Sequence, residues 1–175
     1  MNARDVMTRP AYTCRLDTTL DEASRFMDEN ACGTLIVLDG AGRLAGILTD
    51  RDLALTIGRT ESRPSDVSVV GAMTRNVHTC SPNDDLSVAL ERMSDAKVRR
   101  LPAVDAGGNV QGMLSIDDIV LWGLGHYGVK KKLLVNALRS ICASQNPMFE
   151  TEAVEVCPVT VDLQEFNSAP DDRLR

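Results

Sequence analysis

This chain of 175 residues contains a tandem repeat of one sequence unit. When residues 7–52 are laid on residues 73–118 at a constant offset of 66 without a gap, fourteen positions are identical, whereas unrelated stretches would share roughly three. A tandem pair of this kind usually packs about a pseudo-two-fold axis, and the groove between its halves is a natural place for a ligand. The identical residues of the first copy are Met7, Thr8, Arg9, Thr13, Cys14, Leu20, Ala23, Met27, Leu35, Asp39, Gly42, Gly46, Leu48 and Asp52.

The composition indicates a globular protein. Hydrophobic residues make up 43% of the chain, which is enough for a core, and no apolar run reaches the roughly 18 residues that span a bilayer. The N-terminus does not resemble a signal peptide. A net charge of −6 also argues against a general nucleic-acid binder, which usually displays a basic face. We therefore expect a cytoplasmic protein that neither inserts into a membrane nor binds nucleic acid.

Most of the negative charge lies near the end of the sequence. Residues 145–175 carry seven acidic residues and two arginines, a net charge of −5. The preceding residues carry 17 basic and 18 acidic side chains and are therefore close to neutral. Any selectivity for charged ligands must come from local groups in the repeat.

The cysteines and histidines do not form a recognisable metal or catalytic pattern. The chain has five cysteines, an odd number with no C-x-x-C pair, and two histidines. This favours a reducing compartment over a disulfide framework or a zinc site. Cys14 and Cys80 occupy matching apolar positions and are expected to be buried structural thiols. Neither His78 nor His126 has a repeat partner, and we expect both to be surface or packing residues.

Each copy predicts a β-α-β-β-α unit from its apolar periodicity and turn residues. The expected strands lie at 11–14, 35–38 and 44–48 in the first copy and at 77–80, 101–104 and 110–114 in the second. The expected helices lie at 18–29 and from Thr49 onward, and at 84–96 and from Ser115 onward. Turns at 39–42 and 105–108 join the last two strands of each unit.

The predicted domain organisation has four parts. The first unit covers residues 1–57, a linker rich in Gly, Pro, Ser and Thr covers 58–68, and the second unit covers 69–122. A C-terminal extension at 123–175 contains an amphipathic helix at about 129–144 and then the acidic tail. The alternating stretch at 154–163 reads either as an edge strand or as disordered chain.

The most informative motif occurs once in each copy, at the junction of the last strand and the last helix. Residues 46–52 and 112–118 share the pattern G-h-h-[ST]-x-x-D. One interpretation is a capping box, in which Thr49 and Asp52, or Ser115 and Asp118, satisfy the free amides of a helix start. The other is a nucleotide site, because a helix start favours phosphate and an ionised Asp accepts the hydroxyls of a ribose. The preceding glycine would let a flat ligand approach the backbone.

A second candidate element is the run V-R-R-L-P-A-V-D at 98–105 of the second copy. Adjacent arginines before a buried strand are often only a solvated strand end. Their functional interpretation is phosphate binding, because the planar guanidinium group matches phosphate geometry. Both interpretations of Arg99 and Arg100 stay open at this point.

The repeat, the arginine run and both junction motifs together resemble a tandem pair of CBS domains, over about residues 1–122. The segment L-T-D-R-D-L at 48–53 is similar to small stand-alone bacterial members. The resemblance implies an α/β (α+β) fold, with two β-α-β-β-α units packed about a pseudo-two-fold axis, followed by a C-terminal helix and an acidic tail. It also implies a homodimer and binding of AMP, ADP, ATP, NAD-type ligands or S-adenosylmethionine.

The same resemblance implies two composite ligand sites. Thr49 and Asp52 would join Arg99 and Arg100 in one site, where the hydroxyl, the carboxylate and the basic pair bind ribose and phosphate. Candidates for the wall that contacts adenine are Thr13 and Cys14, or Thr79 and Cys80, with the backbone near Pro102 and Ala103.

The other implied site departs from the family pattern. It keeps Ser115 and Asp118, but Gly33 and Thr34 stand where the first has arginines. Asp117 also replaces the matching Arg51. We therefore expect the first site to be electropositive and the second to be neutral or acidic.

The resulting functional hypothesis is a regulatory module rather than an enzyme. No nucleophile elbow, P-loop or metal-ligand spacing is present in the sequence. The ligand would bias the orientation of the two units and so act on a separate effector protein. Two alternatives remain: an interaction protein that dimerises without ligand, with both junction motifs serving as helix caps, and a metal- or redox-responsive stress protein.

Overall fold

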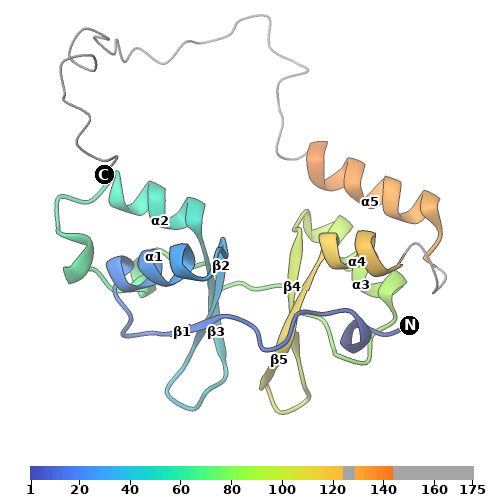
Figure 1. Ribbon diagram of the computed structural model, residues 1–175, viewed down its shortest axis with the longest axis horizontal. Coiled ribbons are helices and arrows are strands. Elements are labelled where there is room, and N and C mark those ends of the chain that lie inside the picture. The colour runs from blue at the N-terminus through green and yellow to red at the C-terminus, as the bar shows by residue number, and fades with distance from the viewer. Residues whose placement is uncertain (124–128, 144–175) are drawn as a thin grey trace, which may run out of the picture. The chain divides into compact units, whose positions relative to one another are not determined.

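The computed structural model describes residues 1–123 and 129–143 (Figure 1). The first repeat folds into a three-stranded sheet in the order β1-β2-β3, with β1 parallel to β2 and β2 antiparallel to β3. Its elements are β1 (Thr13–Arg15), α1 (Leu20–Glu29), β2 (Thr34–Leu38), β3 (Leu44–Thr49) and α2 (Asp50–Ile57). The predicted β-α-β-β-α order is therefore confirmed for this unit.

The second repeat follows the same plan with one difference. Its elements are α3 (Leu86–Ala96), β4 (Arg100–Val104), β5 (Val110–Ser115) and α4 (Ile116–Gly123), and β4 pairs antiparallel with β5. The strand predicted at 77–80 is reduced to one isolated bridge between Cys80 and Ala103. In the first unit, the Ile36 amide donates to the Tyr12 carbonyl at 3.0 Å. The residue matching Ile36 is Pro102, which has no N–H to donate, so the parallel ladder cannot extend.

The first helix of each unit begins slightly later than the sequence predicts. The N-caps are Thr19 and Asp85, rather than Thr18 and Asp84. The predicted residues instead close the turn before the helix. The Thr18 hydroxyl accepts a hydrogen bond from the Arg15 amide at 3.1 Å, and the Asp84 carboxylate accepts one from the Ser81 amide at 2.9 Å. Two adjacent polar residues thus share the capping and turn roles.

Both predicted turns are confirmed. Gly42 and Gly108 have φ values of +79° and +85°, a conformation that glycine adopts without steric cost. Asp39 and Asp105 precede them, and their carboxylates accept backbone hydrogen bonds from within the loops. Those amide donors lower the pKa of both carboxyl groups, because they stabilise the ionised form.

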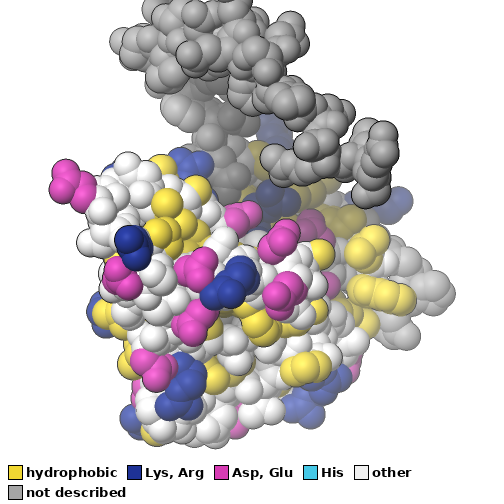
Figure 2. Space-filling view, turned by 60° about the vertical axis from the view of Figure 1, so that its left-hand side comes forward, with side chains coloured by type: hydrophobic (Ala, Val, Ile, Leu, Met, Phe, Trp, Pro, Cys, Tyr) yellow, Lys and Arg dark blue, Asp and Glu magenta, His cyan; other side chains and the backbone are white. Residues whose placement is uncertain are grey.

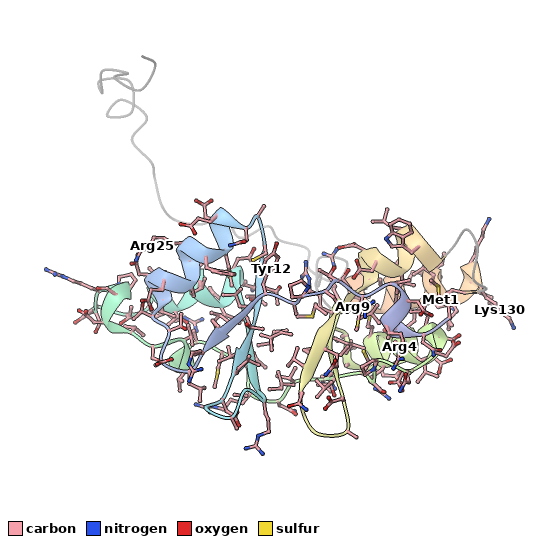
Figure 3. All side chains as sticks on the ribbon, turned by 60° about the horizontal axis from the view of Figure 1, so that its bottom comes forward. Met1, Arg4, Arg9, Tyr12, Arg25 and Lys130 are labelled. Atoms are coloured by element: carbon pink, nitrogen blue, oxygen red, sulfur yellow. The ribbon has the colours of Figure 1, made fainter. Side chains whose placement is uncertain are left out.

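The segment before each repeat packs on the other repeat. Residues 1–8, here called the first arm, contain the short 3-10 helix η1 (Ala3–Asp5) and lie against the second unit. The Ala3 amide donates to the Asp84 carbonyl at 2.9 Å, and Thr8 and Met113 exchange two backbone hydrogen bonds of 2.9 and 3.1 Å. Figure 3 shows Met1, Arg4 and Arg9 following one another beside the second unit before the chain reaches Tyr12.

Residues 67–74, the second arm, make the matching contacts with the first unit. The arm contains η3 (Val69–Gly71) and follows η2 (Pro64–Asp66). The Val69 amide donates to the Thr18 carbonyl at 2.9 Å, and Thr74 and Ile47 exchange two hydrogen bonds of 2.9 Å each. The arms therefore cross the predicted unit boundaries, and each unit is completed by the chain that precedes the other.

Gly46 and Gly112 make room for these arms. A Cβ atom on Gly112 would lie 2.8 Å from the Thr8 carbonyl oxygen, and one on Gly46 would lie 3.0 Å from the Thr74 carbonyl oxygen. Both distances are at or below the closest approach that real Cβ atoms make. The sequence suggested that these glycines admit a ligand to the backbone, whereas in the structure the arm backbone occupies that space.

Two hydrophobic clusters form the core, one for each unit. The second cluster includes α5 (Lys131–Ala143), which begins and ends within the predicted helix at 129–144. Leu134, Ala137 and Ile141 are buried in this cluster, where α5 packs on α3, and the Ser140 hydroxyl donates to the Ser94 carbonyl at 3.1 Å. The helix therefore covers α3 of the second unit.

The helical side of the first unit has no such cover within the described residues. A groove of about 540 Å³ runs between α1 and α2 there. Met27 and Leu53 are buried at its floor, and Ile57 is 36% exposed at its edge. The two repeats thus share a fold but differ in the surface that they present.

The remaining predictions concern charge, membranes and the tail. Figure 2 shows acidic and basic side chains interspersed over the face it displays, in keeping with a repeat region that is close to neutral. No helix in residues 1–123 or 129–143 is long and apolar enough to cross a membrane. The acidic tail and the stretch at 154–163 lie outside the described residues.

Candidate functional site

The junction motif of the first unit forms a complete capping box at the start of α2. The Thr49 hydroxyl accepts a hydrogen bond from the Asp52 amide at 3.2 Å. The Asp52 Oδ2 atom accepts two in return, from the Thr49 amide at 2.9 Å and from its hydroxyl at 2.7 Å. The capping interpretation of the sequence is therefore confirmed for this copy.

Ser115 and Asp118 repeat this geometry at the start of α4. The Asp118 Oδ2 atom accepts from the Ser115 amide at 2.8 Å and from its hydroxyl at 2.7 Å, and the Asp118 amide donates back at 3.1 Å. In both copies Oδ2 makes the cap, and no described residue donates to Oδ1 of Asp52 or Asp118. Capping therefore leaves one carboxylate oxygen of each motif available to a ligand.

The second motif opens into a cavity of about 240 Å³ that both repeats line. Three segments meet there: the chain between the first arm and β1, the connection from α1 to β2, and the β5–α4 junction. The cavity combines hydroxyl, carboxylate and guanidinium groups with an apolar wall, as small-molecule sites do. Its lining residues are Thr8, Ala11, Tyr12, Ala31, Cys32, Gly33, Thr34, Arg100, Met113, Ser115 and Asp118.

The apolar wall of the cavity comes from residues that the sequence did not single out. Tyr12, which is 40% exposed, packs edge-on against Phe26 with ring centroids 5.9 Å apart, and Ala11 and Met113 lie nearby in the lining. An aromatic face beside aliphatic groups suits a flat heterocycle. The repeated Met-Thr-Arg sequence that begins at Met7 marks this segment, but its contact with the other unit is not visible in the sequence.

Arg100 lines this cavity together with Ser115 and Asp118. The sequence grouped it instead with Thr49 and Asp52, and it led us to expect no cation beside Ser115. The register explains the placement, because Arg100 is paired directly with Ser115 across β4 and β5. The cavity therefore contains a guanidinium group in addition to the Asp118 carboxylate.

Arg99 has a different environment. Its guanidinium lies 3.8 Å from the Asp117 carboxylate, and both side chains are more than half exposed. An exposed pair at this distance contributes little to stability. The matching position in the first unit is Gly33, where an added Cβ would lie 3.0 Å from the Asp50 carboxylate.

The residues predicted to contact adenine do not line the cavity. Thr13 and Cys14 are in β1 and pair with β2, and Cys80, Pro102 and Ala103 are buried. None of them, nor Thr79, is among the residues that line the 240 Å³ cavity. Their proposed contact with a ligand stays a prediction.

The matching cysteines have unreactive surroundings. Burial raises the pKa of the Cys14 thiol to about 11, and burial followed by the nearby Asp84 charge raises that of Cys80 to about 11. The folded state therefore disfavours both thiolates. Between pH 9 and pH 11 the unfolded thiols ionise first, so the stability associated with these groups is present below about pH 9 and is lost as the pH rises.

We expect iodoacetamide at pH 8.5 to modify Cys14 and Cys80 much more slowly than Cys142, which is exposed. The reagent attacks the thiolate, which is scarce when the pKa is raised. Peptide mapping by mass spectrometry measures the three rates in the native protein. In the urea-unfolded chain the rates should converge, and equal rates in the native protein would contradict the prediction.

The described residues offer no metal centre. No group of three or more His, Cys, Asp and Glu side chains within residues 1–123 and 129–143 is arranged to hold an ion. His78 lies in this part of the chain and is exposed, whereas His126 and Cys157 lie outside it.

Comparison with protein families gives a match over most of the chain. The model described as "CBS domain" matches residues 3–59 and again residues 65–125. Among curated proteins, the CBS domain-containing protein YhcV of Bacillus subtilis is 31% identical over 120 residues, which is 69% of this chain and 84% of that protein. An uncharacterised 17.7 kDa protein of Acidianus ambivalens is 30% identical over 65% of this chain and 68% of its own length.

Enzymes also match, but only over a small part of their length. The inosine-5′-monophosphate dehydrogenase of Nitrosopumilus maritimus is 28% identical over 66% of this chain, which is 22% of the enzyme. The L-aspartate semialdehyde sulfurtransferase of Methanosarcina acetivorans is 30% identical, again over 22% of its length. The similarity therefore extends to one module of these enzymes.

Solved structures confirm the fold. A CBS domain protein of Thermoplasma acidophilum superposes with a TM-score of 0.67 at 21% identity, over 90% of this chain and 82% of that one. The CBS domain pair of protein MJ0100, solved in complex with 5′-methylthioadenosine and S-adenosyl-L-methionine, has a TM-score of 0.62 at 25% identity and covers 70% and 96% of the two chains.

Proposed function

We propose that this chain, which belongs to the CBS domain family, is a regulatory module that binds an adenosine-containing ligand between its two units. The observation that carries the proposal is the cavity at Ser115 and Asp118, which both repeats line. A ligand held there contacts both units at once and therefore favours one relative arrangement of them.

The chemistry of the cavity supports an adenosine ligand. The free Oδ1 atom of Asp118 can accept the two hydroxyls of a ribose, and Arg100 can bind a phosphate or carboxylate. Tyr12 and Met113 supply an apolar surface for the purine. These groups recognise a ligand through hydrogen bonds, charge and apolar contact, and the Ser115 hydroxyl donates to the Asp118 carboxylate as part of the helix cap.

The related pair from MJ0100 supports the same class of ligand, since it was solved with 5′-methylthioadenosine and S-adenosyl-L-methionine. We extend the proposal to AMP, ADP and ATP because of the arginine in the cavity. Thr49 and Asp52 form the second binding motif of this proposal, since their cap has the same geometry as that of Ser115 and Asp118.

The proposed output is a change in the surface offered to another protein. We propose a homodimer and a separate effector protein, in the cytoplasm, and no catalytic activity of the chain itself. The four cysteines at positions 14, 32, 80 and 142 are free, which suits a reducing compartment. The two enzymes that match this chain over 22% of their length show that a similar module can be joined to a larger protein.

Thermal unfolding with AMP, ATP, 5′-methylthioadenosine and S-adenosylmethionine tests the proposal. A ligand at 100 times its Kd should add about 2.7 kcal/mol of stability, which is a Tm shift on the order of 5 °C for a chain of this size. The shift should fall in Asp118→Asn and disappear when Asp52→Asn is added, because both motifs belong to the proposal. Each substitution retains an oxygen that can accept the capping hydrogen bonds but removes the charge that binds ribose hydroxyls.

Glu22→Gln is the matched control, because Thr19 and Glu22 form the same kind of capping box at the start of α1 without lining the cavity. It should leave the ligand-induced shift unchanged. If no ligand shifts the Tm of the unmodified protein, the alternative of a ligand-independent interaction protein gains support, because both junction motifs already have a complete role as helix caps.

A further inference from the structure

We propose that Arg100 belongs to both ligand sites, so that a phosphate bound at one site withdraws the cation from the other. This inference rests on the proposed function. It predicts that the module binds one phosphorylated and one uncharged adenosine ligand together more readily than two phosphorylated ones.

Two residues that are equivalent in the repeat line the same cavity. Its lining includes Thr34 from β2 and Arg100 from β4. These two residues are 66 positions apart and are therefore equivalent in the repeat. Each is the first residue of its strand, and each is paired with the capping residue of its own unit, Thr34 with Thr49 and Arg100 with Ser115.

The equivalence of the two repeats gives the composition of the second ligand site. The cavity combines Ser115 and Asp118 of one unit with Thr34 of the other. Exchanging each residue for its repeat equivalent combines Thr49 and Asp52 with Arg100. Arg100 and Thr34 both line the observed cavity at Ser115, and the repeat equivalence assigns the same two residues to a site at Thr49 and Asp52. In this arrangement the two sites share one arginine and one threonine.

The two shared residues, Thr34 and Arg100, differ in whether their donor groups are available to a ligand. Thr34 is 8% exposed, and its hydroxyl donates to the Gly33 carbonyl at 2.7 Å, so this donor is already in use. Arg100 is exposed and has no ion-pair partner within the described residues. Arg100 is therefore the available cationic donor of the pair, and the two sites must compete for it.

Competition for one side chain makes the two sites negatively coupled for phosphorylated ligands. A guanidinium group that binds a phosphate through two parallel N–H donors is fixed in one orientation. The second site then keeps its ribose-binding Asp and its apolar wall but lacks a charge for a second phosphate. Couplings between sites in proteins are typically about 5- to 150-fold in affinity, and we expect the two AMP affinities to differ by an amount in that range.

Isothermal titration calorimetry with AMP and with 5′-methylthioadenosine tests the inference. The unmodified protein should bind a first AMP tightly and a second at least about fivefold more weakly, whereas binding of the first AMP should leave the affinity for 5′-methylthioadenosine nearly unchanged. Arg100→Thr makes the two equivalent positions identical. It should weaken the first AMP to the level of the second and leave 5′-methylthioadenosine binding intact.

Arg99→Thr is the control for general loss of positive charge, because Arg99 lies beside Asp117 rather than in the cavity lining. It should preserve the difference between the two AMP affinities. Two equal AMP sites in the unmodified protein, or a tight AMP site that survives Arg100→Thr, would refute the shared arginine while leaving the proposed function in place. Failure of both ligands to bind the unmodified protein would refute the proposed function and the inference together.

Discussion

Replacing Leu134 with alanine is expected to lower the free energy of unfolding by about 2 to 5 kcal/mol. Leu134 is 3% exposed and belongs to the cluster in which α5 packs on the second unit. The change removes buried methyl groups and leaves a cavity between helices that the rest of the core cannot fully close. Urea denaturation followed by circular dichroism measures the loss.

Val135→Ala is the matched control, since Val135 is the next residue of α5 and is 52% exposed. It should change the stability by no more than about 0.5 kcal/mol. If both variants were equally stable, α5 would not be packed on α3 in solution. The cluster that joins Leu134 to Leu90 and Met93 would then have to be closed by another part of the chain.

Replacing Gly112 with alanine is expected to cost about 1 to 3 kcal/mol, as overpacking of a filled site does. The added Cβ would lie 2.8 Å from the Thr8 carbonyl oxygen and 2.9 Å from the Met7 sulfur. Methionine can turn away, but the backbone of the first arm can move only by giving up its two hydrogen bonds with Met113. Urea denaturation gives the size of the loss.

Hydrogen exchange then locates the loss. In Gly112→Ala, the amides of Thr8 and Met113 should lose protection more than the rest of the protein. Gly40→Ala is the control, because nothing lies within 4 Å of a Cβ at Gly40 and its φ is not positive. A Gly112→Ala variant as stable as Gly40→Ala would show that the first arm is not held against β5.

The parts of the fold that depend on neighbouring residues could be predicted from the sequence. The turns around Gly42 and Gly108 follow from glycine's access to positive φ. The caps at Thr49 and Ser115 follow from a hydroxyl and a carboxylate three residues apart. The order of elements followed from the repeat, except where Pro102 lacks the amide that a parallel strand would need.

The parts that depend on distant contacts could not be predicted in this way. Nothing in the local pattern indicates that Thr8 bonds to Met113 rather than to its own unit. The cavity follows from this exchange, since it takes Tyr12 from one unit and Ser115 from the other. Local sequence defines the capping residues, whereas tertiary packing decides which residues face them.

The unequal cover of the two helical surfaces limits how copies of this chain can assemble. In the second unit, α3 is covered by α5 of the same chain, whereas the groove between α1 and α2 is open in the described part of the molecule. A second copy that docks its own α1–α2 surface there forms a self-complementary contact, and that contact uses the same surface on both partners. Such a contact closes at two copies by its own symmetry, because each partner occupies the α1–α2 surface of the other.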